Sequence, residues 1–163
     1  MRALTRSVEE TRALAETLGE VLRPGDLVVL SGALGAGKTA FAQGVARGLG
    51  VTEPVVSPTF TIVRQYEGRV PLAHVDVYRL ERLQELHDLG FDELLDDRVT
   101  IVEWGDAAGP LLPAERLEVR MEETGEDERA IEVLPHGESW QGRARRLGEV
   151  FAAFDPERPG GAS

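Results

Sequence analysis

Residues 32–39 read Gly-Ala-Leu-Gly-Ala-Gly-Lys-Thr, a full match to the phosphate-binding P-loop pattern. Residues 26–31, just before this stretch, form a short apolar run with β-branched valines, and residues 39–49 after it carry apolar side chains at helical spacing. The sequence therefore predicts a buried strand, a glycine-rich loop and a helix in that order. Backbone N–H groups and the positive end of the helix dipole then meet at one point, which makes an anion-binding site.

Lys38 is the single lysine of a chain that has 17 arginines. Elsewhere the chain uses arginine for its positive charges, so position 38 requires a property that arginine lacks. A lysine ammonium is a compact charge on a thin stem that can lie along the loop and reach the β and γ phosphates, whereas a planar guanidinium does not fit there. The composition and the motif therefore support the same interpretation.

The composition narrows the class of protein. The chain has 163 residues, no cysteine and a formal net charge of −11. This length fits one domain, which we place at residues 1–154, and we expect the Pro- and Gly-rich tail at 155–163 to be disordered. The lack of cysteine excludes disulfides and thiol chemistry, and no apolar run approaches the ~20 residues of a membrane span, so we expect a cytoplasmic protein. The acidic excess opposes direct binding to nucleic acid.

Apolar periodicity and turn residues predict the remaining elements. Helices are expected at residues 7–22, 39–49, 81–95 and 139–154, the third of them interrupted near Gly90-Phe91. Strands are expected at 26–31, 60–66, 70–78, 99–104, 116–121 and 130–134. The strand pairs 60–66 with 70–78 and 116–121 with 130–134 are separated by polar turns, which predicts two antiparallel hairpins. The expected fold is α/β, a P-loop NTPase-like sandwich with a mixed parallel and antiparallel sheet.

Hydrolysis needs a metal site in addition to the phosphate loop. Thr39 supplies a hydroxyl for Mg²⁺, and Asp76 and Glu103 each follow an apolar run at the end of a predicted strand. Carboxylates there meet a ligand outside the carboxyl edge of the sheet, and we expect them to lie outside the packed interior. The competing interpretation of each is a solvated acid at a strand end.

Three further features carry less information. The turn Ser57-Pro58-Thr59-Phe60 stands where P-loop proteins keep a loop that senses the γ-phosphate, but such turns are also common without function. Arg79 and Arg129 are candidates for phosphate contacts. The three histidines, at positions 74, 87 and 136, have no metal-ligand spacing and are interpreted as structural or surface residues.

Taken together, these motifs resemble the TsaE (YjeE) family. The resemblance rests on the order and spacing of five segments and extends over roughly residues 7–134: Leu-Gly-Ala-Gly-Lys-Thr at 34–39, Ser-Pro-Thr-Phe-Thr at 57–61, Val-Asp-Val-Tyr-Arg-Leu at 75–80, Leu-Gly-Phe at 89–91 and Val-Glu-Trp at 102–104. It implies a small bacterial ATPase, slow in isolation, that uses ATP and Mg²⁺ and acts with TsaB and TsaD in making threonylcarbamoyladenosine on tRNA. Contact with tRNA is then indirect, through the complex.

The resemblance and the motif together give a predicted site. The residues predicted to bind the nucleotide are Leu34, Gly35, Ala36, Gly37, Lys38, Thr39, Ala40, Thr59 and Arg129. The predicted metal residues are Thr39, Asp76 and Glu103, and the predicted catalytic residues are Lys38, Asp76 and Glu103. The chain departs from the family in having Gly125-Glu126 where a Gly-Arg pair approaches the nucleotide, and Arg129 is the candidate replacement.

Two alternatives remain open from the residues alone. A small-molecule kinase would need an arginine-rich lid, but residues 122–128 of the late hairpin are mostly acidic. A nucleotide-gated binding module with negligible turnover would carry the same loop.

The single lysine allows a direct test of the loop. An amine-reactive label has two targets, Lys38 and the N-terminal amine, and we expect saturating Mg-ATP to protect Lys38 because phosphate oxygens would occupy its ammonium. Peptide mapping by mass spectrometry measures both sites at once, with the N-terminus as internal control. Equal labelling of Lys38 with and without Mg-ATP would contradict the prediction.

Overall fold

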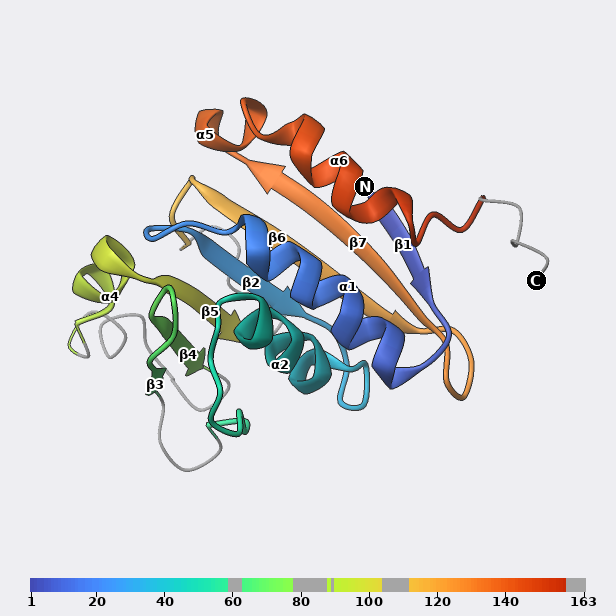
Figure 1. Ribbon diagram of the computed structural model, residues 1–163, viewed down its shortest axis with the longest axis horizontal. Helices are drawn as coiled ribbons and strands as arrows, with labels where there is room; N and C mark the ends of the chain where they lie inside the picture. The colour runs from blue at the N-terminus through green and yellow to red at the C-terminus, as the bar shows by residue number, and fades with distance from the viewer. Residues whose placement is uncertain (59–62, 78–87, 89, 104–111, 158–163) are drawn as a thin grey trace.

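The computed structural model describes residues 1–58, 63–77, 88, 90–103 and 112–157. Its centre is a seven-stranded sheet in the order β1-β7-β6-β2-β5-β4-β3 (Figure 1). The strands are β1 (Arg2–Thr5), β2 (Leu27–Ser31), β3 (Val63–Tyr66), β4 (Leu72–Asp76), β5 (Val99–Glu103), β6 (Arg116–Glu123) and β7 (Arg129–His136). Strands β6, β2, β5 and β4 are parallel to one another, whereas β1, β7 and β3 run antiparallel to their neighbours.

The mixed parallel and antiparallel sheet, covered by helices, confirms the predicted α/β fold class. Both predicted hairpins, β3–β4 and β6–β7, are also confirmed. The structure adds a strand that the sequence analysis lacked, because β1 pairs with β7 at the edge of the sheet. The late hairpin is also longer than expected at both ends.

The described helices are α1 (Val8–Val21), α2 (Lys38–Gly48), α4 (Phe91–Asp97), α5 (Glu138–Gln141) and α6 (Ala144–Ala152). The start of α1 is capped by Ser7, whose Oγ accepts a hydrogen bond from the backbone N–H of Glu10 at 3.1 Å. Some predicted segments lie outside the described part of the chain: residues 81–87 and 89 of the predicted third helix, residues 60–62, 78 and 104 at the ends of predicted strands, and residues 158–163 of the predicted tail. Within that part, no helix is long and apolar enough to cross a membrane.

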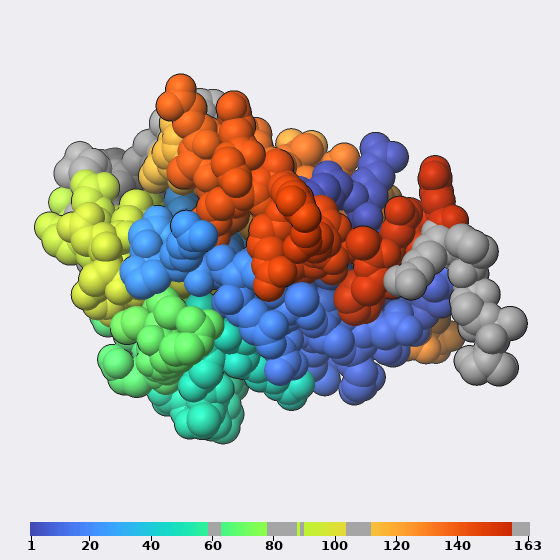
Figure 2. Space-filling model, turned by 45° about the horizontal axis from the view of Figure 1, so that its top comes forward, coloured from blue at the N-terminus to red at the C-terminus, as the bar shows by residue number. Residues whose placement is uncertain are grey.

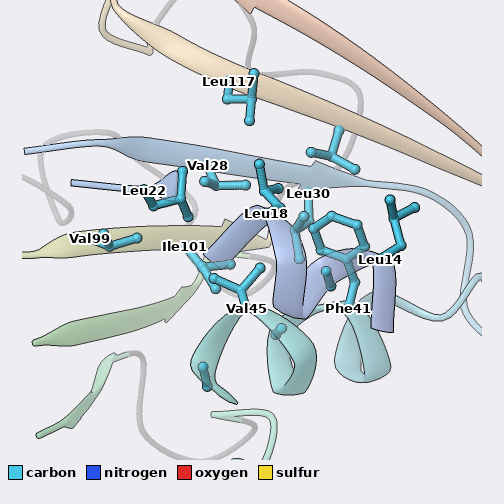
Figure 3. Close-up of a cluster of buried hydrophobic side chains, with 14 of the residues drawn as sticks. Leu14, Leu18, Leu22, Val28, Leu30, Phe41, Val45, Val99, Ile101 and Leu117 are labelled. Carbon is cyan, nitrogen blue, oxygen red and sulfur yellow. The ribbon is translucent and has the colours of Figure 1, made fainter. Parts of the chain in front are cut away.

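The main core lies between the sheet and one layer of helices. Helices α1 and α2 pack side by side on the face that carries Val28, Leu30 and Ile101, and their apolar side chains point into this layer (Figure 3). Helix α6 continues the same layer next to α1. On the opposite face, α4 covers a smaller cluster around Val29, Val75 and Val102.

Helices α1 and α2 approach each other closely through three glycines. Gly19 of α1 and Gly44 and Gly48 of α2 are buried, and a Cβ atom added to any of them would overlap backbone atoms of the facing helix. Side chains larger than hydrogen would therefore force the helices apart.

The C-terminal helix is broken where the sequence predicts one continuous helix, because α5 ends at Gln141 and α6 begins at Ala144. Arg143 stands at the break. Its guanidinium makes two hydrogen bonds to the carboxylate of Asp26, at 2.8 and 2.9 Å, and one to Val21 O, and it lies 4.2 Å from the ring centroid of Trp140. These contacts fix the C-terminal segment against the rest of the fold, where it forms the ridge coloured orange to red in Figure 2.

No described helix covers the second face of β1, β7 and β6, and charged side chains form a ladder there. Ion pairs join Arg2 to Glu132, Glu132 to Arg120 and Arg120 to Glu118. Glu118 also accepts a hydrogen bond from His136 at 3.0 Å. Burial favours the neutral form of Glu118, but the hydrogen bonds and charges of Arg120 and His136 outweigh it, so the pKa of this carboxyl is lowered.

The glycine contact predicts an unusual pair of substitutions. Alanine normally stabilises a helix relative to glycine by roughly 0.5–1 kcal/mol. We expect Gly48→Ala to destabilise the protein instead, by about 1–3 kcal/mol, because its methyl group would overlap the backbone of α1 at Glu16. Gly148→Ala in α6 is the control, since its Cβ would meet nothing within 4 Å and should stabilise. Chemical denaturation measures both, and equal effects would contradict the packing described here.

Candidate functional site

The glycine-rich loop connects β2 to α2 and contains three glycines with positive φ, namely Gly32 (150°), Gly35 (85°) and Gly37 (98°). Residues with a Cβ rarely adopt this conformation, so the glycines are required by the path of the backbone. Gly32 is also close to β6, because an added Cβ would lie 2.5 Å from Met121 O. The bond from Ala36 N to Ala33 O, at 3.0 Å, tightens the centre of the loop.

Lys38 and Thr39 occupy the first turn of α2, directly after the loop. The Lys38 ammonium crosses the loop and donates a hydrogen bond to Gly32 O at 2.7 Å. The first residue of the loop is thereby joined to the first residue of α2. Because the N-cap is Gly37, no side chain caps the N–H groups at the start of α2. The loop can therefore present backbone donors, a helix N-terminus and an ammonium to one anion.

The two predicted carboxylates lie beside each other at the carboxyl edge of the sheet. Glu103, the last residue of β5, is paired in register with Asp76, the last residue of β4, and with Leu30 of β2. The glycine loop begins two residues after Leu30. Side chains alternate along a strand, so Asp76 and Glu103 share the sheet face on which α2 packs. The structure therefore brings the loop and both carboxylates to the same edge and the same face.

Glu103 is more buried than the sequence analysis expects, with 8% of its surface exposed. Its Oε1 is 3.0 Å from Nε2 of His74, a fully buried residue of β4. From the sequence, His74 is interpreted as a structural or surface residue, because the three histidines lack metal-ligand spacing. The signal that was present is its position two residues before Asp76, which puts both side chains on one face of the strand.

Arg129, at the start of β7, lies next to the loop. Its Nη1 donates to the carbonyl oxygens of Gly125, Glu126 and Glu128, which holds the turn of the late hairpin. A Cβ added to Gly37 would be 3.9 Å from Arg129 Nε, so the Arg129 side chain lies beside Gly37 of the glycine loop. The structure thus places Arg129 at the loop, while its contact with a nucleotide stays a prediction.

The structure describes some of the other predicted site residues but not all of them. Leu34 and Gly35 belong to the loop and Ala40 to the first turn of α2, and Ala36 is a buried residue of the loop. Thr59 and Arg79 lie outside the described residues.

Asp76, Glu103 and Thr39 are described residues near this edge that could hold Mg²⁺ together with phosphate oxygens. Among the described residues, no group of three or more His, Cys, Asp or Glu side chains could hold a metal ion. Mg²⁺ is commonly held by one or two carboxylates together with substrate phosphates and water. The arrangement of Asp76, Glu103 and the Thr39 hydroxyl next to an anion-binding loop suits that mode.

The fold and this edge define an α/β protein with a mixed sheet and a glycine-rich anion-binding loop ahead of a helix. A family model described as "Threonylcarbamoyl adenosine biosynthesis protein TsaE" matches residues 5–131. The chain belongs to the TsaE family.

Individual relatives agree with the family assignment. The chain is 45% identical to the tRNA threonylcarbamoyladenosine biosynthesis protein TsaE of Bacillus subtilis, over 84% of this chain and 87% of that protein. It is 40% identical to the Treponema pallidum protein of the same name, over 82% of this chain and 99% of the relative. The crystal structure of Bacillus subtilis YdiB superposes with a TM-score of 0.76 at 37% identity, covering 91% of this chain and 94% of YdiB.

Proposed function

We propose that this protein is a P-loop ATPase that binds and hydrolyses ATP with Mg²⁺ in the biosynthesis of tRNA threonylcarbamoyladenosine. The observation that carries the proposal is the meeting of three features at one sheet edge: the glycine loop, the single lysine that crosses it, and the register-paired carboxylates of Asp76 and Glu103. The names of the relatives support the tRNA-modification part of the proposal.

The proposed roles follow from the chemistry of each group. Backbone N–H groups of residues 34–40 and the Lys38 ammonium hold the phosphates, and Arg129 contributes a charge from the hairpin side. Thr39 and Glu103 hold Mg²⁺, and Asp76 supports the metal or the attacking water. When bound, Mg²⁺ neutralises charge on the transferring phosphoryl group.

The partners in this proposal are TsaB and TsaD, and the location is the cytoplasm. With a net charge of −11, the chain alone is expected to bind tRNA poorly, so contact with tRNA runs through the complex. Phosphate release measured with and without TsaB and TsaD distinguishes this proposal from a nucleotide-gated binding module, which would show no turnover in either case. Transfer of phosphate to a small-molecule acceptor would favour the kinase instead.

The role of Lys38 predicts that Lys38→Arg loses most ATPase activity and binds ATP more weakly, although the charge is kept. The reason is geometric, since the loop accommodates an ammonium and not a planar fork. Steady-state phosphate release measures the loss, and turnover within about twofold of the parent would remove Lys38 from the phosphate site.

A further prediction concerns the residues of the proposed metal site, Thr39, Asp76 and Glu103. Thr39→Ala, Asp76→Ala and Glu103→Gln should each impair Mg²⁺-dependent hydrolysis, because each removes one group from the same metal site. Glutamine is used at position 103 because the side chain is buried and bonded to His74. Glu20→Ala, at an exposed position of α1, is the control. Loss of hydrolysis in only one of the three variants would contradict a shared site.

A further inference from the structure

We propose that His74 is a positioning residue that orients the Glu103 carboxylate toward the metal site, an inference that rests on the ATPase function proposed above. His74 lies on β4 and Glu103 on β5, and the bond of 3.0 Å between Nε2 and Oε1 crosses the two strands. With one oxygen held by the ring, the other oxygen of Glu103 is directed away from it.

Burial of both side chains restricts the Glu103 carboxylate to one orientation. The His74 side chain is fully inaccessible, and 10% of the Glu103 side chain is exposed. In the described part of the chain, His74 is the side chain that hydrogen-bonds this carboxylate. A carboxylate held in a largely dry site by a fixed donor keeps one orientation, whereas an unheld carboxylate would sample several rotamers.

The second ring nitrogen indicates the direction of the bond. Nδ1 of His74 is buried and has no partner among the described residues. A buried N–H without an acceptor is rarer than an unpaired acceptor, so the tautomer with the proton on Nε2 is favoured. The ring then donates to Glu103, and Glu103 keeps its acceptor capacity for a cation.

The register of the strands gives the bond a second effect. Asp76 and Glu103 are direct neighbours on adjacent strands, and carboxylates in that position repel each other. A donor on Oε1 draws electron density from Glu103 and fixes its distance from Asp76. Because the carboxylate is already oriented before the metal binds, less free energy is needed to order it on binding.

The experiment compares three variants of the full chain. His74→Leu removes the donor, and His74→Gln keeps an amide N–H near the position of Nε2. His136→Leu is the matched control, because His136 also approaches a glutamate, Glu118, with its Nε2 at 3.0 Å, but on the open face of the sheet. The probes are Mn²⁺ binding to protein loaded with the β,γ-imido analogue of ATP, measured by electron paramagnetic resonance, and binding of the same analogue in EDTA.

We expect His74→Leu to weaken Mn²⁺ binding about tenfold or more, as is typical when the partner of a metal ligand is lost. His74→Gln should recover most of this loss, His136→Leu should bind as the parent does, and analogue binding in EDTA should stay within about twofold in all three. Parent-like Mn²⁺ binding by His74→Leu would overturn the proposal. If His74→Leu does not fold, His74→Asn replaces it, because the shorter amide does not reach Glu103, and parent-like Mn²⁺ binding by that variant would overturn the proposal equally.

A second measurement uses the metal-free protein. The chain has three histidines, so long-range ¹H–¹⁵N spectra can assign the tautomer of each ring. We expect the Nε2–H tautomer for His74, and finding Nδ1–H would overturn the proposal. Failure of the parent to bind the analogue at all would instead remove the proposed ATPase function, which separates the two conclusions.

Discussion

The parallel pairing of β5 with β2 on one side and β4 on the other places the glycine loop and both carboxylates of the candidate site. All five residues of β5 are buried, so both of its faces are specified by packing. A slip of one residue would turn Glu103 to the face covered by α4 and bring Val102 toward α2. Leu30 and Asp76 both pair with Glu103, so the two ladders of β5 set the position of the glycine loop and of both carboxylates.

Much of the fold could be predicted because its signals are local. The glycine loop, the buried strand before it and the two hairpins are each encoded within short stretches of sequence. Strand β1 could not be predicted in that way, since its four residues gain their conformation from β7, which lies about 130 positions away. The break between α5 and α6 was missed because apolar spacing continues across it, and what stabilises the break is the distant carboxylate of Asp26.

The residues of the candidate site also differ in whether their sequence signals are local. Loop residues and strand-end acids could be found from the sequence, because each is marked by its immediate neighbours. The pairing of His74 with Glu103 spans 29 positions, and its meaning depends on strand order and on burial. Arg129 was proposed as a replacement for a family arginine, and the structure shows how a residue of β7 can reach the loop, because its side chain lies beside Gly37.

The backbone contact between α1 and α2 has a mechanical consequence. Helices separated by long side chains can slide past each other as the side-chain rotamers adjust. Gly44 and Gly48 instead bring the backbone of α2 into contact with that of α1, without side chains between them. Helix α2 is therefore held in a fixed position behind the glycine loop. In the proposed function, phosphates bound at its N-terminus would therefore lie in front of a helix that is held from behind by backbone contact, while the glycine loop itself contacts Met121 of the β6–β7 hairpin.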